Sequence, residues 1–182
     1  MGVGVIFLIV IAIFAVVLIM IYNRLVGLRQ NCNQGFADID AQLQQRNDLI
    51  PNLVETVKGY AGHEKSTLDA VIAARAHAAS GSAEGEAELS RAVGSLLALA
   101  ESYPDLKASA NFQTLQHELA DIEDKLAAAR RAFNSAAADY NGAREAFPAV
   151  LFANAMGFAE RPFMTIADSD RARIGAAPTV KF

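Results

Sequence analysis

The sequence predicts an all-α protein in which an N-terminal transmembrane helix is followed by an up-down antiparallel four-helix bundle. Three observations lead to this prediction. The chain begins with an uncharged apolar run that is long enough to cross a bilayer. Beyond residue 22, apolar side chains recur every three or four positions, which is the period of a helix face. Hydrophobic residues make up 53% of the chain, yet Trp is absent and alanine, a strong helix former, supplies much of the apolar content.

The transmembrane segment is predicted from Val3–Ile21, which contains no charged or polar side chain. A helix needs about 20 apolar residues to cross roughly 30 Å of hydrocarbon. A buried core helix is a poorer interpretation, because such helices are rarely apolar on every face over this length. A cleaved signal peptide is disfavoured, since no basic region precedes the run and no small-residue cleavage site follows it. We therefore expect residues 1–23 to form the span, with membrane lipid contacting Val3–Tyr22.

The flanking arginines predict which side of the membrane each end occupies. No Lys or Arg precedes the span, whereas Arg24 and Arg29 follow it closely. Because basic residues are retained on the cytoplasmic side, we expect the N-terminus outside and the C-terminal domain in the cytoplasm. Cys32 is the only cysteine, so no disulfide can form within the chain, which suits a reducing compartment.

The pattern after the span predicts that the same helix continues into the soluble domain. Its apolar positions are Leu25, Leu28, Cys32, Phe36, Ile39, Leu43 and Ile50. Pro51 lacks the N–H that would bond the carbonyl of Asn47, so we expect a kink or break there. Gly59 and Gly62 then predict a turn, because each costs about 1 kcal/mol inside a helix. A single bent helix that reaches Ala79 is the alternative.

Two more helices are expected before the chain loses its periodic pattern. Ser80–Gly85 holds small and turn-forming residues and predicts a loop. The next apolar face runs from Leu89 to Tyr103, Pro104 stops that helix, and residues 105–110 form a connection. The last long helix has a heptad seam typical of coiled coils, made of Phe112, Leu115, Leu119, Ile122, Leu126, Ala129, Phe133, Ala136 and Tyr140.

The remaining chain is divided by its prolines and its charge. Phe147-Pro148 ends the last helix, and the apolar piece Ala149–Phe158 is expected to cover one end of the bundle. Helices joined by short loops pack as antiparallel neighbours. We therefore predict that residues 24–158 form the four-helix domain and that residues 159–182 form an extended tail.

Composition and motifs argue against nucleic-acid binding and catalysis. The net charge of −4 provides no basic stripe for nucleic acid. His63-Glu64 begins like the zinc motif H-E-x-x-H, but Thr67 stands where the second histidine is needed. None of the three histidines has Glu three residues before it, as a di-iron bundle requires. No phosphate-binding glycine loop or nucleophile elbow occurs. We therefore expect no catalytic residue, no cofactor and no metal, and a protein that is not an enzyme.

A polar cluster surrounds Pro51 and the turn that follows it. Its members are Arg46, Asp48, Asn52, Glu55, Lys58, His63 and Glu64. In one interpretation, Asp48 and Asn52 satisfy the backbone groups freed by the proline, and Arg46 pairs with a carboxylate. In the other, the cluster is a notch that binds a partner or a small ligand. Both interpretations stay open at this point.

Several blocks of the sequence resemble the LemA family. They are Tyr22-Asn23-Arg24-Leu25-Val26, Arg46-Asn47-Asp48-Leu49-Ile50-Pro51-Asn52-Leu53-Val54, Lys58-Gly59-Tyr60, Glu101-Ser102-Tyr103-Pro104-Asp105-Leu106-Lys107 and Pro178-Thr179-Val180-Lys181-Phe182. The blocks occur in the family's order along the whole chain, and the D-L-I-P-N-L-V and Y-P-D-L-K stretches are specific. Gln45 and Phe36 depart from the family, which usually has a basic residue and a tryptophan there.

The resemblance implies a single-pass protein of the bacterial cytoplasmic (inner) membrane with a cytoplasmic four-helix domain and a short outward-facing N-terminus. It implies no catalytic residue, and members often look linked to membrane proteases or envelope-stress proteins. We expect a non-enzymatic scaffold or adaptor that forms homo-oligomers or binds such a membrane partner. The alternative is an envelope-stress sensor that binds a small ligand or metal near Pro51.

Overall fold

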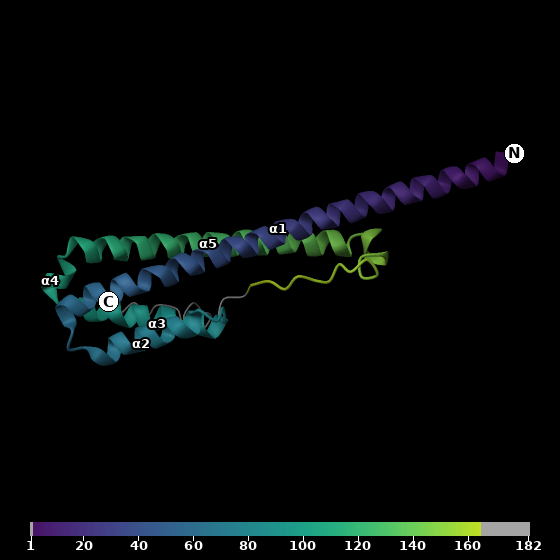
Figure 1. Ribbon diagram of the computed structural model, residues 1–182. Helices are drawn as coiled ribbons and strands as arrows, with labels where there is room; N and C mark the ends of the chain where they lie inside the picture. Colours follow the sequence, from purple (N-terminus) through teal and green to yellow (C-terminus); the bar gives the residue numbers. More distant parts are fainter. Residues whose placement is uncertain (1, 165–182) are drawn as a thin grey trace, which may run out of the picture. The chain divides into compact units, whose positions relative to one another are not determined.

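The computed structural model describes residues 2–164, and its regular structure is helical throughout that range (Figure 1). This confirms the all-α prediction. The elements are α1 (Gly2–Ala61), α2 (Lys65–Ala78), α3 (Ala83–Ala100), α4 (Pro104–Lys107), α5 (Ala110–Glu145) and a 3-10 turn, η1 (Ala149–Leu151). Within the described range, α1 is the one helix that is long and apolar enough to cross a membrane. Most of the expected tail, residues 165–182, lies outside the described residues.

Helix α1 is a single helix of 60 residues. As expected, no linker separates the apolar run from the rest, because nothing near Tyr22 breaks the helical pattern. Side chains from Val3 to Met20 are exposed, apart from the half-buried Leu18. The helix continues through Pro51 and ends at Ala61, where the N–H of Glu64 donates to the Ala61 carbonyl and closes a turn. The alternative of one bent helix reaching Ala79 is therefore wrong.

The described chain folds into two compact units. Unit 1 is built from residues 2–39 and 128–164, and unit 2 from residues 40–127. Helices α1 and α5 contribute to both units. Each unit buries its own set of apolar side chains.

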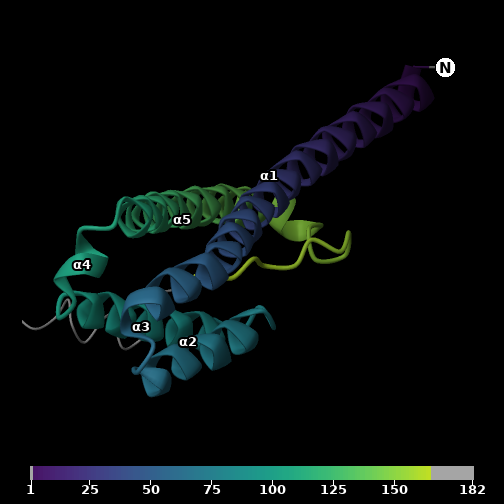
Figure 2. The same cartoon turned by 60° about the vertical axis from the view of Figure 1, so that its left-hand side comes forward.

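Unit 2 has one hydrophobic core to which all of its helices contribute. Helices α2 and α3 lie side by side in both views of the ribbon (Figures 1 and 2). The buried members are Ile50, Leu53, Val54, Val57 and Ala61 of α1, Leu68, Val71, Ala74 and Ala78 of α2, Leu89, Leu96 and Ala100 of α3, Leu106 of α4, and Phe112, Leu115 and Leu119 of α5. The predicted apolar faces of these helices therefore meet in a common core.

In unit 1, two asparagines of α5 hold the extended chain that follows it. Asn141 both donates to the carbonyl of Arg161, at 2.8 Å, and accepts from its N–H, at 3.0 Å. Asn134 makes the same pair of bonds with Met164, at 2.9 and 2.8 Å. Asn134 and Asn141 are seven helical residues apart, a rise of about 10.5 Å. Arg161 and Met164 are three extended residues apart, a span of about 9–10 Å, so the two amides have nearly the same spacing as the main-chain groups that they bond. Side-chain amides thus satisfy main-chain groups that have no strand partner.

The connections around α3 differ from those expected. Helix α3 begins at Ala83, inside the predicted loop, because the Ser82 hydroxyl accepts a hydrogen bond from the N–H of Gly85 at 3.0 Å. A serine N-cap of this kind satisfies a free N–H of the first turn. Pro104 does not end α3, which stops at Ala100. It begins the short helix α4 instead, where a first-turn proline loses no hydrogen bond.

Gly85 provides a stability test of the packing between α2 and α3. A Cβ atom at Gly85 would lie 2.6 Å from the carbonyl oxygen of His77, which is main chain and cannot rotate away. We expect Gly85→Ala to lower the free energy of unfolding by about 1–3 kcal/mol, measured by circular dichroism during urea unfolding. Gly94 of the same helix has open space around it, so Gly94→Ala should raise stability by about 0.5–1 kcal/mol. Equal effects of the two changes would contradict this close approach.

Candidate functional site

Arg46 is the centre of the candidate site because it is a charged side chain buried inside unit 2. Its side chain is only 4% exposed. Nη1 donates to Ser90 Oγ at 3.1 Å and to Glu123 Oε1 at 2.7 Å, and Nη2 donates to the carboxylate of Glu86. The arginine of α1 thereby bonds side chains of α3 and α5. The prediction that Arg46 pairs with a carboxylate is confirmed.

The helical spacing of α1 explains why this arginine is buried. Arg46 lies three residues after Leu43 and four before Ile50, so it occupies the buried face of the helix. A buried charge must be paired and hydrogen-bonded, and the planar guanidinium can bond two carboxylates at once. The apolar pattern has a gap at this position, which was the available sequence signal. It could not show that Glu86, Ser90 and Glu123 are the partners.

Arg75 of α2 satisfies the backbone group that Pro51 leaves free. Its Nε donates to the carbonyl oxygen of Asn47 at 3.0 Å, the atom that a residue other than proline at position 51 would bond. The prediction that Asp48 and Asn52 satisfy this group is wrong, because both side chains lie on the exposed face of α1. The helix therefore passes the proline with its hydrogen bonding completed from a neighbouring helix.

This bond predicts an interaction between two substitutions. Arg75→Ala should lower the free energy of unfolding by about 1–2 kcal/mol, because the partly buried carbonyl loses its donor. In a Pro51→Ala background the same change should cost less, since alanine restores a main-chain N–H that can reach Asn47. Urea unfolding of the four proteins in the cycle measures the difference. An Arg75→Ala effect that is identical in both backgrounds would exclude this role.

The other predicted residues lie at the surface or at the turn. Glu55 and Lys58 form an exposed ion pair at 3.3 Å, and His63 is exposed in the turn after α1. Glu64 accepts a hydrogen bond from the Tyr103 hydroxyl at 3.0 Å, and this bond raises the pKa of that hydroxyl above its ordinary value of 10.0. The structure thus brings Glu64 together with Tyr103.

An open groove runs beside the Arg46 cluster within unit 2. It has a volume of about 360 Å³ and is lined by Gln45, Asp48, Leu49, Glu118, Asp121, Ile122 and Lys125. Three of the lining side chains are carboxylates and one is an amine, and Lys125 already pairs with Asp121 at 2.6 Å. The groove is therefore acidic, and its charge favours a basic group. In the part of the chain that the structure describes, no three His, Cys, Asp or Glu side chains are grouped to hold a metal ion.

Cys32 of α1 is buried in unit 1 with 1% of its surface exposed. Burial raises the pKa of its thiol above the ordinary value of 9.0, and Arg161 opposes the shift. The folded state therefore favours the neutral thiol. Its contribution to the free energy of unfolding is fully present below pH 9.0, and this contribution is lost as the pH rises through the pKa of the folded state.

The buried thiol should react slowly with alkylating reagents, because the thiolate is the nucleophile. We expect iodoacetamide to modify Cys32 much more slowly than an exposed cysteine, because only 1% of its surface is exposed and its raised pKa lowers the thiolate fraction. Ser135→Cys in a Cys32→Ser background supplies the exposed control, because Ser135 is exposed in the middle of α5, away from the helix ends. Mass spectrometry gives both rates. Equal rates would contradict the burial of Cys32.

The model of the LemA family matches residues 35–182. The chain belongs to the LemA family. This confirms the resemblance drawn from the blocks around Pro51 and Pro104. The match to LemA begins at Gly35, so the apolar first part of α1 precedes it.

Two sets of relatives are similar to this LemA-family chain. The magnetosome protein MamQ of Magnetospirillum gryphiswaldense is 26% identical over 176 residues, which cover 80% of this chain and 65% of MamQ. Magnetosome proteins MamQ 1 and MamQ 2 of Paramagnetospirillum magneticum are each 23% identical over 159 residues, covering 70% of this chain and 58% of theirs. The chain thus spans less than two thirds of these relatives. Neither the LemA family nor these relatives is named as an enzyme, and the apolar helix indicates a membrane-associated protein.

Proposed function

We propose that this LemA-family protein is a non-enzymatic scaffold or adaptor at the cytoplasmic face of a bacterial inner membrane. Val3–Tyr22 crosses the bilayer in contact with lipid, and the following helices form an up-down antiparallel four-helix bundle. The bundle acts by assembling with itself or by binding a membrane partner. The expected partner class is a membrane protease or an envelope-stress protein.

The observation that carries the proposal is the continuity of α1. One helix of 60 residues contains both the apolar run and Arg46, whose side chain bonds to α3 and α5. No flexible linker lies between these parts. Anchoring the run in lipid therefore also anchors the helix that contributes to the core of unit 2. This arrangement suits a protein whose role depends on being held at a membrane.

The shape and charge of the groove support a protein partner. Small-molecule sites usually enclose most of the ligand surface, whereas this groove is open along α1 and α5. Its carboxylates, including Asp48 and Glu118, favour a basic segment. A partner helix or loop carrying Lys or Arg has a charge that complements this groove.

Arg24 and Arg29 support the proposed orientation, because basic residues next to a span are retained in the cytoplasm. A membrane-impermeant amine reagent applied to intact spheroplasts should label the N-terminal amine and spare the lysines of the domain. Labelling of those lysines at the same rate would reverse the orientation.

In-membrane cross-linking tests the proposed function. A photoreactive amino acid at Gln45 or Glu118 of the full chain should give adducts with a second copy or with a membrane protein, identified by mass spectrometry. The same group at Gln116 is the control, because two residues turn a helix by about 200° and place it away from the groove. Asp121→Lys should reduce the adducts by reversing a charge of the groove. Solubilised protein that stays monomeric at every concentration and gives no adduct would overturn the proposal.

A further inference from the structure

The segment after α5 exposes a group of large apolar side chains. Phe147, Val150 and Leu151 are 81%, 49% and 63% exposed. The opposite side of the segment is buried, because Ala153 and Phe158 are only 2% and 1% exposed. One side of the segment therefore packs on the rest of unit 1, and the other side exposes apolar side chains.

This segment is apolar, and most of its main-chain N–H groups after Ala149 are bonded within it. No charged side chain occurs between Glu145 and Glu160, and the one amide side chain, that of Asn154, accepts from Arg144 at 3.2 Å. Main-chain N–H groups of residues 150–153 and 156–158 all donate to carbonyls within residues 146–154. Apolar surroundings require such internal satisfaction, because lipid offers no partner for a free N–H.

The segment packs against the apolar run of α1. The ring centroids of Phe152 and Phe14 are 6.0 Å apart, in an edge-to-face arrangement. Phe14 precedes the last residue of the run, Ile21, by seven positions, which is a rise of about 10 Å along the helix. Phe152 therefore lies at the level of the run and not beyond its end. Figures 1 and 2 both show the first part of α1 extending past this segment.

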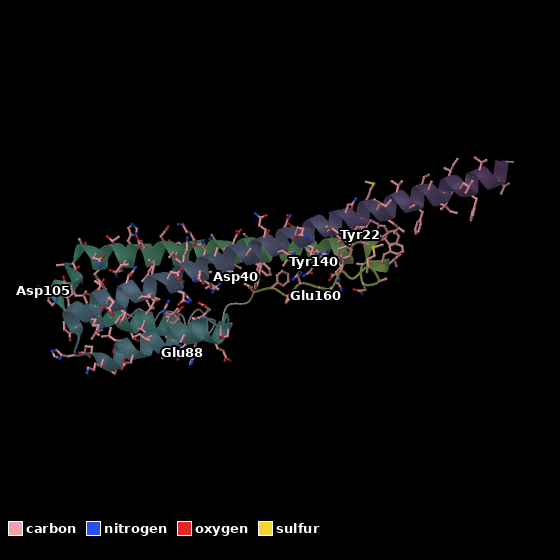
Figure 3. The ribbon with its side chains drawn as sticks, in the orientation of Figure 1. Tyr22, Asp40, Glu88, Asp105, Tyr140 and Glu160 are labelled. Atoms are coloured by element: carbon pink, nitrogen blue, oxygen red, sulfur yellow. The ribbon has the colours of Figure 1, made fainter. Side chains whose placement is uncertain are left out.

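The end of the segment meets the residues expected at the membrane surface. Phe158 packs edge-to-face on Tyr22, whose position is labelled in Figure 3, with ring centroids 5.4 Å apart. The guanidinium of Arg29 lies 5.2 Å from the centroid of the Phe158 ring. Tyrosine and arginine are typical residues of the interface between lipid and water. The segment therefore runs from the level of the apolar run to the level of its polar boundary.

We propose that Phe147, Val150 and Leu151 insert into the bilayer beside the span and form a second lipid contact of this protein. The inference rests on the proposed placement of Val3–Tyr22 in a membrane. Continuity identifies the occupant: Phe152 contacts the run itself, so the lipid that surrounds the run also reaches the exposed side of the segment. The insertion anchors the end of α5 directly, and it gives the membrane-proximal part of unit 1 two points of attachment.

The absence of Trp from the sequence allows a direct test. Leu151→Trp and Phe147→Trp each place one indole on the exposed side of the segment, where the change leaves the core intact. The full chains are reconstituted in phosphatidylcholine–phosphatidylglycerol vesicles whose acyl chains are brominated near the headgroup or near the chain end. Ile13→Trp marks the span, and Ile72→Trp, at an equally apolar exposed site of α2, is the matched control.

We expect both indoles of the segment to show blue-shifted emission and to be quenched most by lipid brominated near the headgroup. The Ile13→Trp indole should be quenched by lipid brominated near the chain end, and the Ile72→Trp indole by acrylamide alone. Segment indoles that brominated lipid does not quench, with Ile13→Trp still quenched, would overturn this inference and leave the membrane anchor standing. Burial of the segment against a second copy of the chain would give the same absence of lipid quenching. In that case the indoles would be protected from acrylamide as well. Loss of lipid quenching at Ile13→Trp would overturn the anchor itself.

Discussion

Replacing Arg46 with methionine should lower the free energy of unfolding by about 3–5 kcal/mol, the usual effect of removing one partner from a buried ion pair. Methionine keeps much of the volume but leaves the carboxylate of Glu86 with 13% of its side chain exposed and no cation beside it. Glu123 is half exposed and regains water, so its loss contributes less. Urea unfolding of the full chain in detergent, followed by helical circular dichroism, measures the effect.

A double substitution separates the loss of the pair from the loss of packing. Arg46→Met together with Glu86→Gln should recover part of the lost stability, because no uncompensated charge remains buried. Lys125→Met removes an exposed pair with Asp121 on α5 and should change stability by less than about 1 kcal/mol. If the single and double variants are equally unstable, the Glu86 carboxylate is not the source of the loss. If Arg46→Met behaves like Lys125→Met, the arginine does not hold the three helices together.

Phe158→Ala should lower the free energy of unfolding of unit 1 by about 3–5 kcal/mol, because a fully buried ring is deleted. The change also removes the ring that packs on Tyr22 and lies beneath Arg29. We expect the segment after α5 to detach from α1, so that a protease cuts between α5 and Arg161 well before the helices unfold. Limited proteolysis with mass spectrometry, together with urea unfolding, records both effects.

The matched control is a second phenylalanine of the same stretch. Phe163 is 51% exposed, so Phe163→Ala should change stability by no more than about 0.5 kcal/mol. Both variants remove the same ring chemistry, and only the burial differs. Similar proteolysis of the two variants would mean that Phe158 does not hold the segment in place.

The helices were largely predictable because their signal is local. The spacing of three and four residues identified the buried face of α5, where seven of the nine predicted seam residues are buried and the alanines Ala129 and Ala136 are half-buried. The turn near Gly62 was also predicted. Boundaries were predicted less accurately, because Ser82 caps α3 earlier than its small neighbours suggested, and Pro104 starts α4 instead of ending α3.

Of the residues in the candidate site, only Arg46 could be predicted from the sequence. Arg46 interrupts an apolar face, and that alone predicts a buried charge in need of a partner. Its partners come from positions 40 and 77 residues further along the chain. The donor that completes the helix at Pro51 is likewise distant, since Arg75 belongs to another helix.

Residue spacing along the chain was therefore enough to identify an apolar N-terminal helix and an all-helical domain, and the resemblance of specific sequence blocks indicated the family. The tertiary structure alone decided which carboxylates neutralise Arg46, which side chain completes the hydrogen bonding at Pro51, and which side of the segment after α5 stays exposed. The physical reason is that a helix face depends on neighbours three and four residues away. A buried charge or a free carbonyl is satisfied only by the groups that folding brings within hydrogen-bonding distance.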